Sequence, residues 1–278
     1  MFSFGPKISI ITVNYNNGPG LQRTIESVLS QNYTDVEFIV IDGDSNDSSK
    51  TVINKYASKI DKKVSEKDKG IYNAMNKGVL MAEGEYLLFL NSGDHFIKST
   101  TLNEMATYIN TEDIICFNIQ VKEQNKEYIK SHPQNITFSF LYTDTLAHQS
   151  TFIKKDLFNK VGLYDETLKI VSDWKFFVKA LVQYNCSYRS ISKTLTRYYL
   201  DGISATSEGT FIRRDERKGI LEKEFSLFDN DYKRMELLKS NRFKILIELE
   251  NSKISKKAIS LWLRILLKVF RNKNVKDI

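Results

Sequence analysis

The chain has 278 residues, of which 41% are hydrophobic and 27% charged, which fits one large globular domain or one domain with an extension. It contains neither a run of about 18 uncharged apolar residues nor a basic start followed by a long apolar core, so we expect no membrane span and no signal peptide. Cys116 and Cys186 lie far apart and form no CxxC pair, which indicates buried thiols in a reducing compartment.

The net charge of +7 is concentrated at the C-terminal end. Residues 251–278 contain eight lysines and arginines and one aspartate, so their net charge is +7, the same as that of the whole chain. The preceding 250 residues are therefore electrically balanced. A neutral body argues against nucleic acid as a partner, and the basic tail needs a separate explanation.

Apolar runs and amphipathic segments alternate along the first 90 residues. The predicted order, with a possible further strand before the last helix, is strand 7–13, helix 21–31, strand 36–42, a helix from about 49, helix 70–84 and strand 85–90. This alternation predicts an α/β fold with a largely parallel sheet and helices on both of its faces.

The pattern loosens after residue 100 and becomes helical after about residue 208. The predicted elements are a strand pair at 113–121 and 126–131, a loop entering a strand at 145–153, a helix at 172–184, an edge strand at 193–200, and helices at 210–228, 231–250 and 254–272. We therefore expect a main domain over residues 1–208 and a helical extension over residues 209–278.

Polar side chains follow three of the predicted strands, at the points where the strands end. They are Asn14, Asn16, Asp42, Asp44 and Asp94. Each is by itself a common turn former. In open α/β sheets, however, ligands bind beyond the carboxyl ends of the strands, so together these residues predict a binding site at that edge.

Several stretches resemble the inverting family 2 glycosyltransferases with the GT-A fold. They are "ISIITVNYN", "TIESVLSQNYTDVEFIVIDGDSND", "DKGIYNAMNKGVLMAEGEYLLFLNSGD" and "VSDWKFF", spread over about residues 7–205. The resemblance is strongest to bacterial enzymes that build O-antigen or capsular polysaccharide. It implies a Rossmann-like, mixed but largely parallel sheet, and transfer of a hexose or N-acetylhexosamine from a nucleotide diphosphate sugar to a glycan acceptor that we expect to be lipid-linked.

The resemblance also implies residues for the nucleotide-sugar site. Thr12, Asn14 and Tyr15 would line the base pocket. The family usually carries paired aspartates after the second strand, but Gly43 holds the second place here, so Asp42 or Asp44 would contact the base. The remaining donor-side residues would be Lys69, Asn76, Asn91 and Ser92.

The stretch "LLFLNSGDH" stands where the family often has several aspartates that hold a metal. Only Asp94 keeps a carboxylate here. Because Mg²⁺ binds through one or two carboxylates together with substrate phosphates, we expect a weakened Mg²⁺ or Mn²⁺ site that forms only with the nucleotide. His95 is either an additional ligand or an incidental neighbour.

Asp173, in "VSDWKFF", matches the catalytic base of the family. An inverting transfer needs one carboxylate to take the proton from the acceptor hydroxyl. Asp173 would also be favoured at the start of a helix, with Ser172 as the cap, and both roles are compatible. His148 matches a position on the acceptor side, and its alternative is a structural histidine.

Residues 255–270, "SKKAISLWLRILLKVF", predict a basic amphipathic helix. Its polar stripe contains Lys257, Ser260, Arg264 and Lys268, and its apolar side contains Ile259, Trp262, Leu263, Leu266 and Phe270. Such a helix is typical of peripheral attachment to an anionic membrane, here the cytoplasmic face. The alternatives are packing on the main domain or a dimer contact.

Two other functions compete with glycosyl transfer. A non-catalytic nucleotide-sugar-binding or assembly protein would explain the missing carboxylates at residues 91–93. A sugar nucleotidyltransferase would require a basic, glycine-rich phosphate loop after the first strand, but "VNYNNGPGLQR" contains only Arg23.

Overall fold

The computed structural model describes residues 5–123, 126–200, 202, 206–238 and 240–271. It divides into two compact units, Met1–Ile220 and Leu221–Ile278, each of which is described by itself. The first unit therefore extends beyond residue 208 and includes the first part of the helix Ser207–Glu224.

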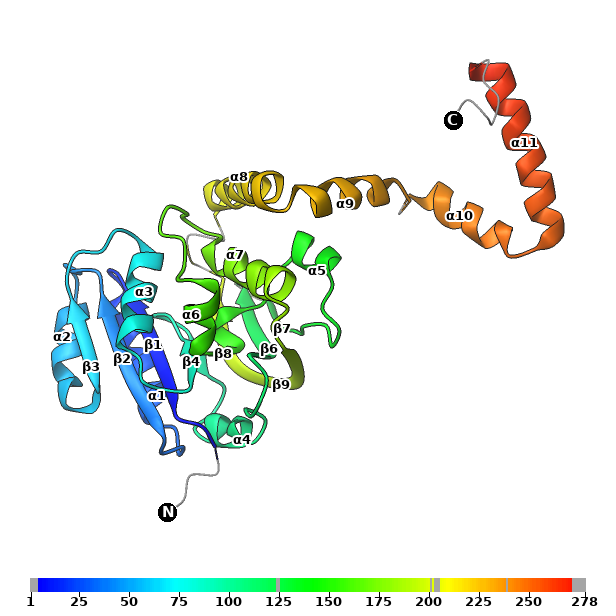
Figure 1. Ribbon diagram of the computed structural model, residues 1–278. Coiled ribbons are helices and arrows are strands. Elements are labelled where there is room, and N and C mark those ends of the chain that lie inside the picture. The colour runs from blue at the N-terminus through cyan, green and yellow to red at the C-terminus, as the bar shows by residue number, and fades with distance from the viewer. Residues whose placement is uncertain (1–4, 124–125, 201, 203–205, 239, 272–278) are drawn as a thin grey trace. The chain divides into compact units, whose positions relative to one another are not determined.

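A single nine-stranded sheet forms the centre of the first unit (Figure 1). Its strands are β1 (Ile8–Asn14), β2 (Val36–Asp42), β3 (Lys62–Ser65), β4 (Tyr86–Phe89), β5 (His95–Phe96), β6 (Ile114–Glu123), β7 (Lys126–Lys130), β8 (Thr151–Lys154) and β9 (Tyr188–Tyr199). The order across the sheet is β3-β2-β1-β4-β8-β6-β9-β5, and β7 pairs with β6.

The sheet is mixed, and its first four strands in chain order are all parallel to one another. Strands β3, β2, β1 and β4 are mutually parallel neighbours, as the alternation of strands and helices predicts. Strand β8 then runs antiparallel to both β4 and β6. Parallel neighbours end at the same edge, and Asn14 lies opposite Asp42, which lies opposite Ser65.

Helices cover both faces of this sheet, which confirms the predicted α/β architecture. The helices of the first unit are α1 (Gly18–Leu29), α2 (Ser49–Lys55), α3 (Ile71–Met81), α4 (Thr101–Ala106), α5 (Phe138–Thr143), α6 (Asp156–Val161), α7 (Ser172–Val178) and the first part of α8 (Ser207–Glu224). Short 3-10 segments lie at Ala57–Lys59 and His148–Ser150, and a π-helical segment, Lys179–Gln183, follows α7.

Alternation along β1 separates the two hydrophobic cores. Ile8 and Ile10 pack with α1, α2 and α4 on one face, whereas Ile11 and Val13 pack with α3, α6 and α7 on the other. The approach of α3 to β1 requires Gly78, because a Cβ there would lie 2.4 Å from Cγ2 of Ile11. The β-branched strand runs are therefore buried on both sides, as expected for parallel strands.

Three details of the predicted elements are wrong. Helix α1 begins at Gly18 rather than residue 21, because the Asn17 side chain accepts from the Gly20 amide and Pro19 fits the first turn. Strand β9 is not an edge strand, since it lies between β6 and β5. The stretch 231–250 is not one helix, because Ser240 caps a new one through its hydroxyl.

The second unit contains the end of α8 and the helices α9 (Ser226–Leu238), α10 (Asn241–Glu250) and α11 (Lys253–Arg271). Helix α11 confirms the helix predicted over 254–272. Among the described residues, no helix combines the length and the apolar character needed to cross a bilayer.

Candidate active site

The carboxyl ends of β1, β2, β3 and β4 carry the polar loops that the sequence singles out. These strands are parallel neighbours, so the loops at 15–17, 43–48, 66–70 and 91–94 all leave one edge of the sheet. This is the edge at which open α/β sheets bind ligands.

Asp42 is a buried brace between these loops. Its carboxylate has no exposed surface and accepts hydrogen bonds from Asn14 Nδ2 at 2.8 Å, Ser45 Oγ at 2.6 Å and Ser65 Oγ at 2.8 Å. Burial by itself raises the pKa of Asp42, but the hydrogen bonds outweigh burial and lower it. Asn14 and Asp42 therefore hold three strand ends together, and neither is open to a ligand in this structure.

Two further predicted donor-side residues hold the walls of the site. Thr12 is fully buried, and its hydroxyl donates to the Leu90 carbonyl at 2.8 Å, which ties β1 to the end of β4. Asn76 is also buried. Its Nδ2 donates to the Tyr164 carbonyl and to Glu166 Oε1, each at 2.9 Å. Its Oδ1 accepts from the Tyr164 amide, also at 2.9 Å. Asn76 thus fixes the 164–166 loop against α3.

Other predicted residues are accessible from solvent. The Tyr15 ring is 67% exposed at the end of β1. Asp44 is exposed and pairs with Lys50 at 2.6 Å, and its backbone has a φ of 62°. Lys69 is exposed in the loop before α3, where its amide donates to Asn73.

The loop after β4 is fastened to β1 and α1. The Ser92 amide donates to the Val13 carbonyl at 3.1 Å, and its hydroxyl to the Asn17 carbonyl at 3.2 Å. Thr24 on α1 accepts from the Gly93 amide at 3.0 Å and donates to the Asp94 carbonyl at 2.7 Å. The backbone of this loop is therefore preorganised.

The candidate metal-binding side chains of this loop suit only an ion that a bound ligand also coordinates. Within the described ranges, no three His, Cys, Asp or Glu side chains are grouped so that they could hold a metal. The loop after β4 offers the Asp94 carboxylate, which is 5% exposed. A hard oxygen ligand fits Mg²⁺ or Mn²⁺, and the remaining ligands would have to come from a diphosphate and water. Both ring nitrogens of His95 are engaged, by the Phe96 carbonyl and the Tyr199 hydroxyl.

A chain of hydrogen bonds joins this loop to Asp173. The Asn91 amide nitrogen lies 3.2 Å from His148 Nε2, and His148 Nδ1 lies 3.0 Å from Asp173 Oδ2. With the amide nitrogen facing Nε2, that ring nitrogen accepts, so the proton is on Nδ1 and is donated to Asp173. Asn91, where the family often has an aspartate, thus sets the orientation of His148.

Tyr72 of α3 holds the other oxygen of the Asp173 carboxylate. Its hydroxyl lies 3.0 Å from Asp173 Oδ1 and 2.6 Å from the Ile170 carbonyl. Burial and the charge of Asp173 raise the pKa of Tyr72 far above its ordinary value, so Tyr72 remains protonated as a donor.

Asp173 is an ionised carboxylate in a largely buried position. Burial raises its pKa, but hydrogen bonds from His148, the Trp174 amide and Tyr72 outweigh burial and bring the pKa below its ordinary value. Its side chain keeps 13% of its surface exposed, so one edge is accessible. Asp173 lies in the first turn of α7, as predicted, but the cap is Val171 and not Ser172. The arrangement can accept a proton from a bound hydroxyl.

Helix α8 holds the segment that precedes Asp173. The Glu216 carboxylate accepts from the amides of three successive residues, Lys169 at 2.6 Å, Ile170 at 3.1 Å and Val171 at 3.2 Å. The next residue, Arg217, places its guanidinium carbon 4.8 Å from the centre of the Trp174 ring. These contacts lie within the first unit, so the start of α8 belongs to the site physically.

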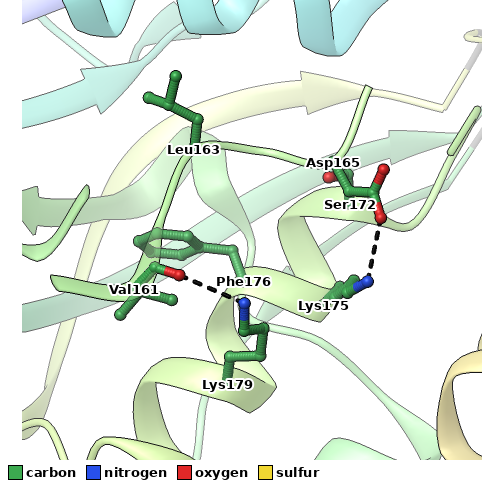
Figure 2. Close-up of a pocket in the computed structure, with 7 residues that line it drawn as sticks. All are labelled: Val161, Leu163, Asp165, Ser172, Lys175, Phe176 and Lys179. Atoms are coloured by element: carbon green, nitrogen blue, oxygen red, sulfur yellow. Dashed lines mark hydrogen bonds and ion pairs between the residues drawn. The ribbon is translucent and has the colours of Figure 1, made fainter. Parts of the chain in front are cut away.

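A small pocket of about 110 Å³ lies beside α7 (Figure 2). Lys175 pairs with Asp165 at 3.0 Å, and Lys179 donates to the Val161 carbonyl at 3.3 Å. Nucleotide-sized ligands need pockets of about 300 Å³ or more, and Asp173 does not line this one. We therefore interpret it as a packing gap and not as the donor site.

Sequence reasoning missed Tyr72, Glu216 and Arg217, which support Asp173, and Asp68, which lies beside Gly43. Tyr72 lies in a stretch whose pattern is that of an ordinary amphipathic helix. Glu216 and Arg217 stand in a run of charges beyond the predicted domain boundary. No local pattern distinguishes such residues from solvated ones, because the partners named above are 25 or more residues away.

Comparison with known proteins places this geometry in a family. Residues 9–167, more than half of the chain, match the family model described as "Glycosyl transferase family 2". A "PGL/p-HBAD biosynthesis glycosyltransferase" of Mycobacterium bovis is 27% identical over 180 residues, which cover 63% of this chain and 69% of that protein. An uncharacterized glycosyltransferase of Mycobacterium tuberculosis is 28% identical over 218 residues, or 77% of this chain and 82% of that protein.

Solved structures share the fold. Residues 1–349 of S. aureus TarS in complex with UDP superimpose with a TM-score of 0.57 and 25% identity, over 69% of this chain and 60% of that chain. The mannosyltransferase PcManGT from Pyrobaculum calidifontis, in complex with GDP-Man and Mn²⁺, gives a TM-score of 0.54 at 13% identity, over 97% of this chain and 89% of that chain. The fold is therefore of the GT-A type.

Proposed function

Since the chain belongs to glycosyl transferase family 2 and is a glycosyltransferase, we propose that it moves a hexose or N-acetylhexosamine from a nucleotide diphosphate sugar to a glycan acceptor with inversion. The observation that supports this most is the environment of Asp173. It offers one ionised, oriented carboxylate that is joined through His148 to the loop that follows β4. Inversion in a single displacement requires one such base, in contrast to the two carboxylates of glycoside hydrolases.

The donor would bind across the ends of β1 to β4. The UDP complex of TarS supports this proposal, because its fold superimposes on 69% of this chain. Tyr15 and the loops at 43–48 and 66–70 would hold the nucleoside, and the loop with Asn91 and Ser92 would face the sugar and diphosphate. The acceptor hydroxyl would then approach from the side of His148 and Asp173.

The residues of the chain have distinct roles in this proposal. Asp173 takes the proton of the attacking hydroxyl. His148 and Tyr72 hold the two carboxylate oxygens and keep them ionised by donating to them. Asn91 fixes the tautomer of His148, and Glu216 fixes the backbone before α7. Holding the base in one geometry before the reaction lowers the entropic cost of the transition state.

A Mg²⁺ or Mn²⁺ ion shared between Asp94 and the donor diphosphate is part of the proposal. Such an ion neutralises the charge that develops on a departing diphosphate. The Mn²⁺ complex of PcManGT supports it at the level of the fold only, and the single carboxylate of the loop predicts weak binding in the absence of nucleotide.

A panel of UDP-, GDP- and dTDP-linked hexoses and N-acetylhexosamines tests the reaction. Polyprenyl-diphosphate-linked sugars serve as acceptors, with and without Mg²⁺ or Mn²⁺. We expect release of nucleoside diphosphate with at least one donor and a product whose anomeric configuration, read by proton NMR, is opposite to that of the donor. Retention of configuration would refute inversion, and the lack of release with every donor would refute the transfer.

We propose further that α11 attaches the enzyme to the cytoplasmic face of an anionic membrane, where it acts on a lipid-linked acceptor of a surface polysaccharide such as O-antigen or capsule. Large apolar side chains of α11 are exposed, among them Trp262 at 64% and Phe270 at 75%. Arg264 and Lys268 lie on the opposite side of the same helix. An apolar face opposite cations matches an anionic lipid surface, and each cation near it contributes about 1 kcal/mol.

Flotation with phosphatidylglycerol vesicles tests this attachment. The full chain should float at low salt and be partly released at high salt, and phosphatidylcholine vesicles should bind it weakly. Replacing Trp262 and Phe270 by serine should abolish flotation. If the chain instead doubles its mass in light scattering and ignores vesicles, α11 is a contact between copies.

A further inference from the structure

His132 is a buried histidine that lies outside the group of residues hydrogen-bonded to Asp173. It stands in the connection between β7 and α5, with 5% of its surface exposed. Its backbone carbonyl accepts from Ser190 Oγ at 3.0 Å, and the carbonyl of the next residue, Pro133, accepts from the Tyr188 hydroxyl at 2.9 Å. Both donors belong to β9, so this strand fixes the backbone that carries the His132 ring.

The His132 ring binds the backbone directly before His148. The Ala147 amide donates to His132 Nε2, and the two nitrogens are 3.2 Å apart. The Ala147 carbonyl accepts from Thr151 Oγ1 at 2.7 Å. Side chains therefore hold both backbone polar groups of Ala147, His132 from the connection before α5 and Thr151 from β8. The His148 side chain begins one residue further on, so these two bonds fix the point from which it starts.

His132 can hold this amide only as a neutral ring. A ring nitrogen that accepts from an N–H carries no proton, so the proton of the neutral ring is on Nδ1. Burial and the charge of Lys130 outweigh the opposing charge of Asp144 and lower the pKa of His132 to about 4. The ring therefore remains an acceptor for the Ala147 amide at neutral pH.

The hydrogen bonds of His148 tolerate little movement of its backbone. Its Nε2 lies 3.2 Å from the Asn91 amide nitrogen, and its Nδ1 lies 3.0 Å from Asp173 Oδ2. These bonds leave two sides of one rigid ring, so a displacement of about 1 Å would stretch at least one of them beyond hydrogen-bond range. A misplacement of this size can lower the rate of an enzyme by about 100-fold. The residues that fix Ala147 therefore bear on the geometry of Asp173.

We propose that His132 is a positioning residue of the transfer reaction, which acts through Ala147 on His148 and, through His148, on Asp173. This inference rests on the proposed function, because it concerns the same base. His132 supplies the acceptor that keeps the backbone before His148 in place, and it does not contact the substrate. Loss of this acceptor should misplace His148 and lower kcat, whereas donor binding at the ends of β1 to β4 should stay the same.

Three substitutions of His132 separate its acceptor from its volume. His132→Gln places a carbonyl oxygen near the position of Nε2 and keeps an acceptor. His132→Phe fills a similar volume without an acceptor, and the side chain of His132→Asn is one methylene shorter and does not reach the Ala147 amide. We expect kcat to fall by about tenfold or more in the Phe and Asn variants and to stay within about threefold of the wild type in the Gln variant, with donor KM within about twofold in all three.

Initial rates of nucleotide release with the full chain, and thermal unfolding by circular dichroism, measure these effects. Gln134→Ala is the matched control, because Gln134 is an exposed residue of the same connection. This control should retain the kcat and the melting temperature of the wild type.

A double-mutant cycle with His148→Gln distinguishes positioning from a general loss of stability. If His132 acts through His148, then His132→Phe adds less than about twofold to the loss that His148→Gln causes alone. His132→Phe should also move the acidic limb of the kcat/KM profile to higher pH, in the same direction as His148→Gln. Both variants weaken the hydrogen bond that lowers the pKa of Asp173. A role limited to packing would give losses that multiply and an unmoved limb.

The outcomes separate the inference from the proposed function. If sugar is transferred and His132→Phe keeps more than half of the wild-type kcat, the inference is overturned and the proposed function remains. The same holds if the losses in the cycle multiply, or if neither His132→Phe nor His132→Asn folds while His132→Gln does, since His132 then serves the fold alone. If the wild type transfers sugar from no donor, the proposed function fails and the inference fails with it.

Discussion

Replacement of Glu216 by alanine tests whether α8 holds the segment before the proposed base, Asp173. The carboxylate accepts three backbone hydrogen bonds from residues 169–171, directly before Ser172 and Asp173. A hydrogen bond to a charged group contributes about 1.5–3 kcal/mol when buried. Because Glu216 is half-buried and water can replace part of the loss, we expect the variant to lose about 1–3 kcal/mol of unfolding free energy. That corresponds to a decrease of roughly 2–10 °C in Tm.

The kinetic effect of Glu216→Ala should be specific. The loops proposed to bind the donor lie at the ends of β1 to β4, and none of their described residues has a recorded contact with Glu216, so KM for the donor should change less than twofold. A misplaced base lowers kcat, and we expect a decrease of at least tenfold. Thermal unfolding by circular dichroism and initial rates of nucleotide release measure the two effects.

Two controls accompany this variant. Glu216→Gln retains one acceptor oxygen and should give intermediate values. Glu208→Ala changes an exposed carboxylate on the same helix and should match the wild type. If Glu216→Ala melts at the wild-type temperature and retains kcat, the contacts to residues 169–171 do not position Asp173 and the reasoning is refuted.

Three further predictions concern the surroundings of the proposed base and the proposed metal site. His148→Gln removes a hydrogen bond that lowers the pKa of Asp173, so this pKa rises and the acidic limb of the kcat/KM profile moves to higher pH; an unmoved limb would show that His148 does not act on Asp173. Tyr72→Phe removes the donor to Asp173 Oδ1 and should lower kcat about tenfold with little change in donor KM; a rise in KM alone would place Tyr72 in donor binding. Asp94→Ala should weaken nucleoside diphosphate binding in Mg²⁺ or Mn²⁺ but not in EDTA, and full wild-type activity in EDTA would eliminate the metal from the proposal.

The first half of the fold could be predicted because its signals are local. The β-branched runs of β1 and β2 and the periodicity of α1 and α3 depend only on neighbours in sequence, and the parallel order of β1, β2 and β4 follows from the crossover helices between them. Strand β9 was wrongly predicted to lie at the edge of the sheet. Its outer neighbour β5 has only two residues and carries no recognisable sequence pattern.

The identity of several candidate site residues could be predicted from the sequence, but the contacts between them could not. Asp173 and His148 follow from the resemblance, yet the contact between them joins residues that are 25 positions apart, and the next link, to Asn91, spans 57. Sequence pattern also does not separate a ligand-facing carboxylate from a buried brace, and Asp42 is such a brace. Asp68 was overlooked because it stands in the charged run "SEKDKG", which reads as a solvated loop.

Asp173→Asn tests the central claim most directly. The amide keeps the size of the side chain but cannot take a proton, and loss of a general base costs about 10² to 10⁴ in rate. We therefore expect single-turnover sugar transfer to fall by at least a factor of about 100, while calorimetric affinity for the nucleoside diphosphate stays within about threefold of the wild type. A variant that transfers sugar at more than half of the wild-type rate would contradict the assignment of Asp173 as the base.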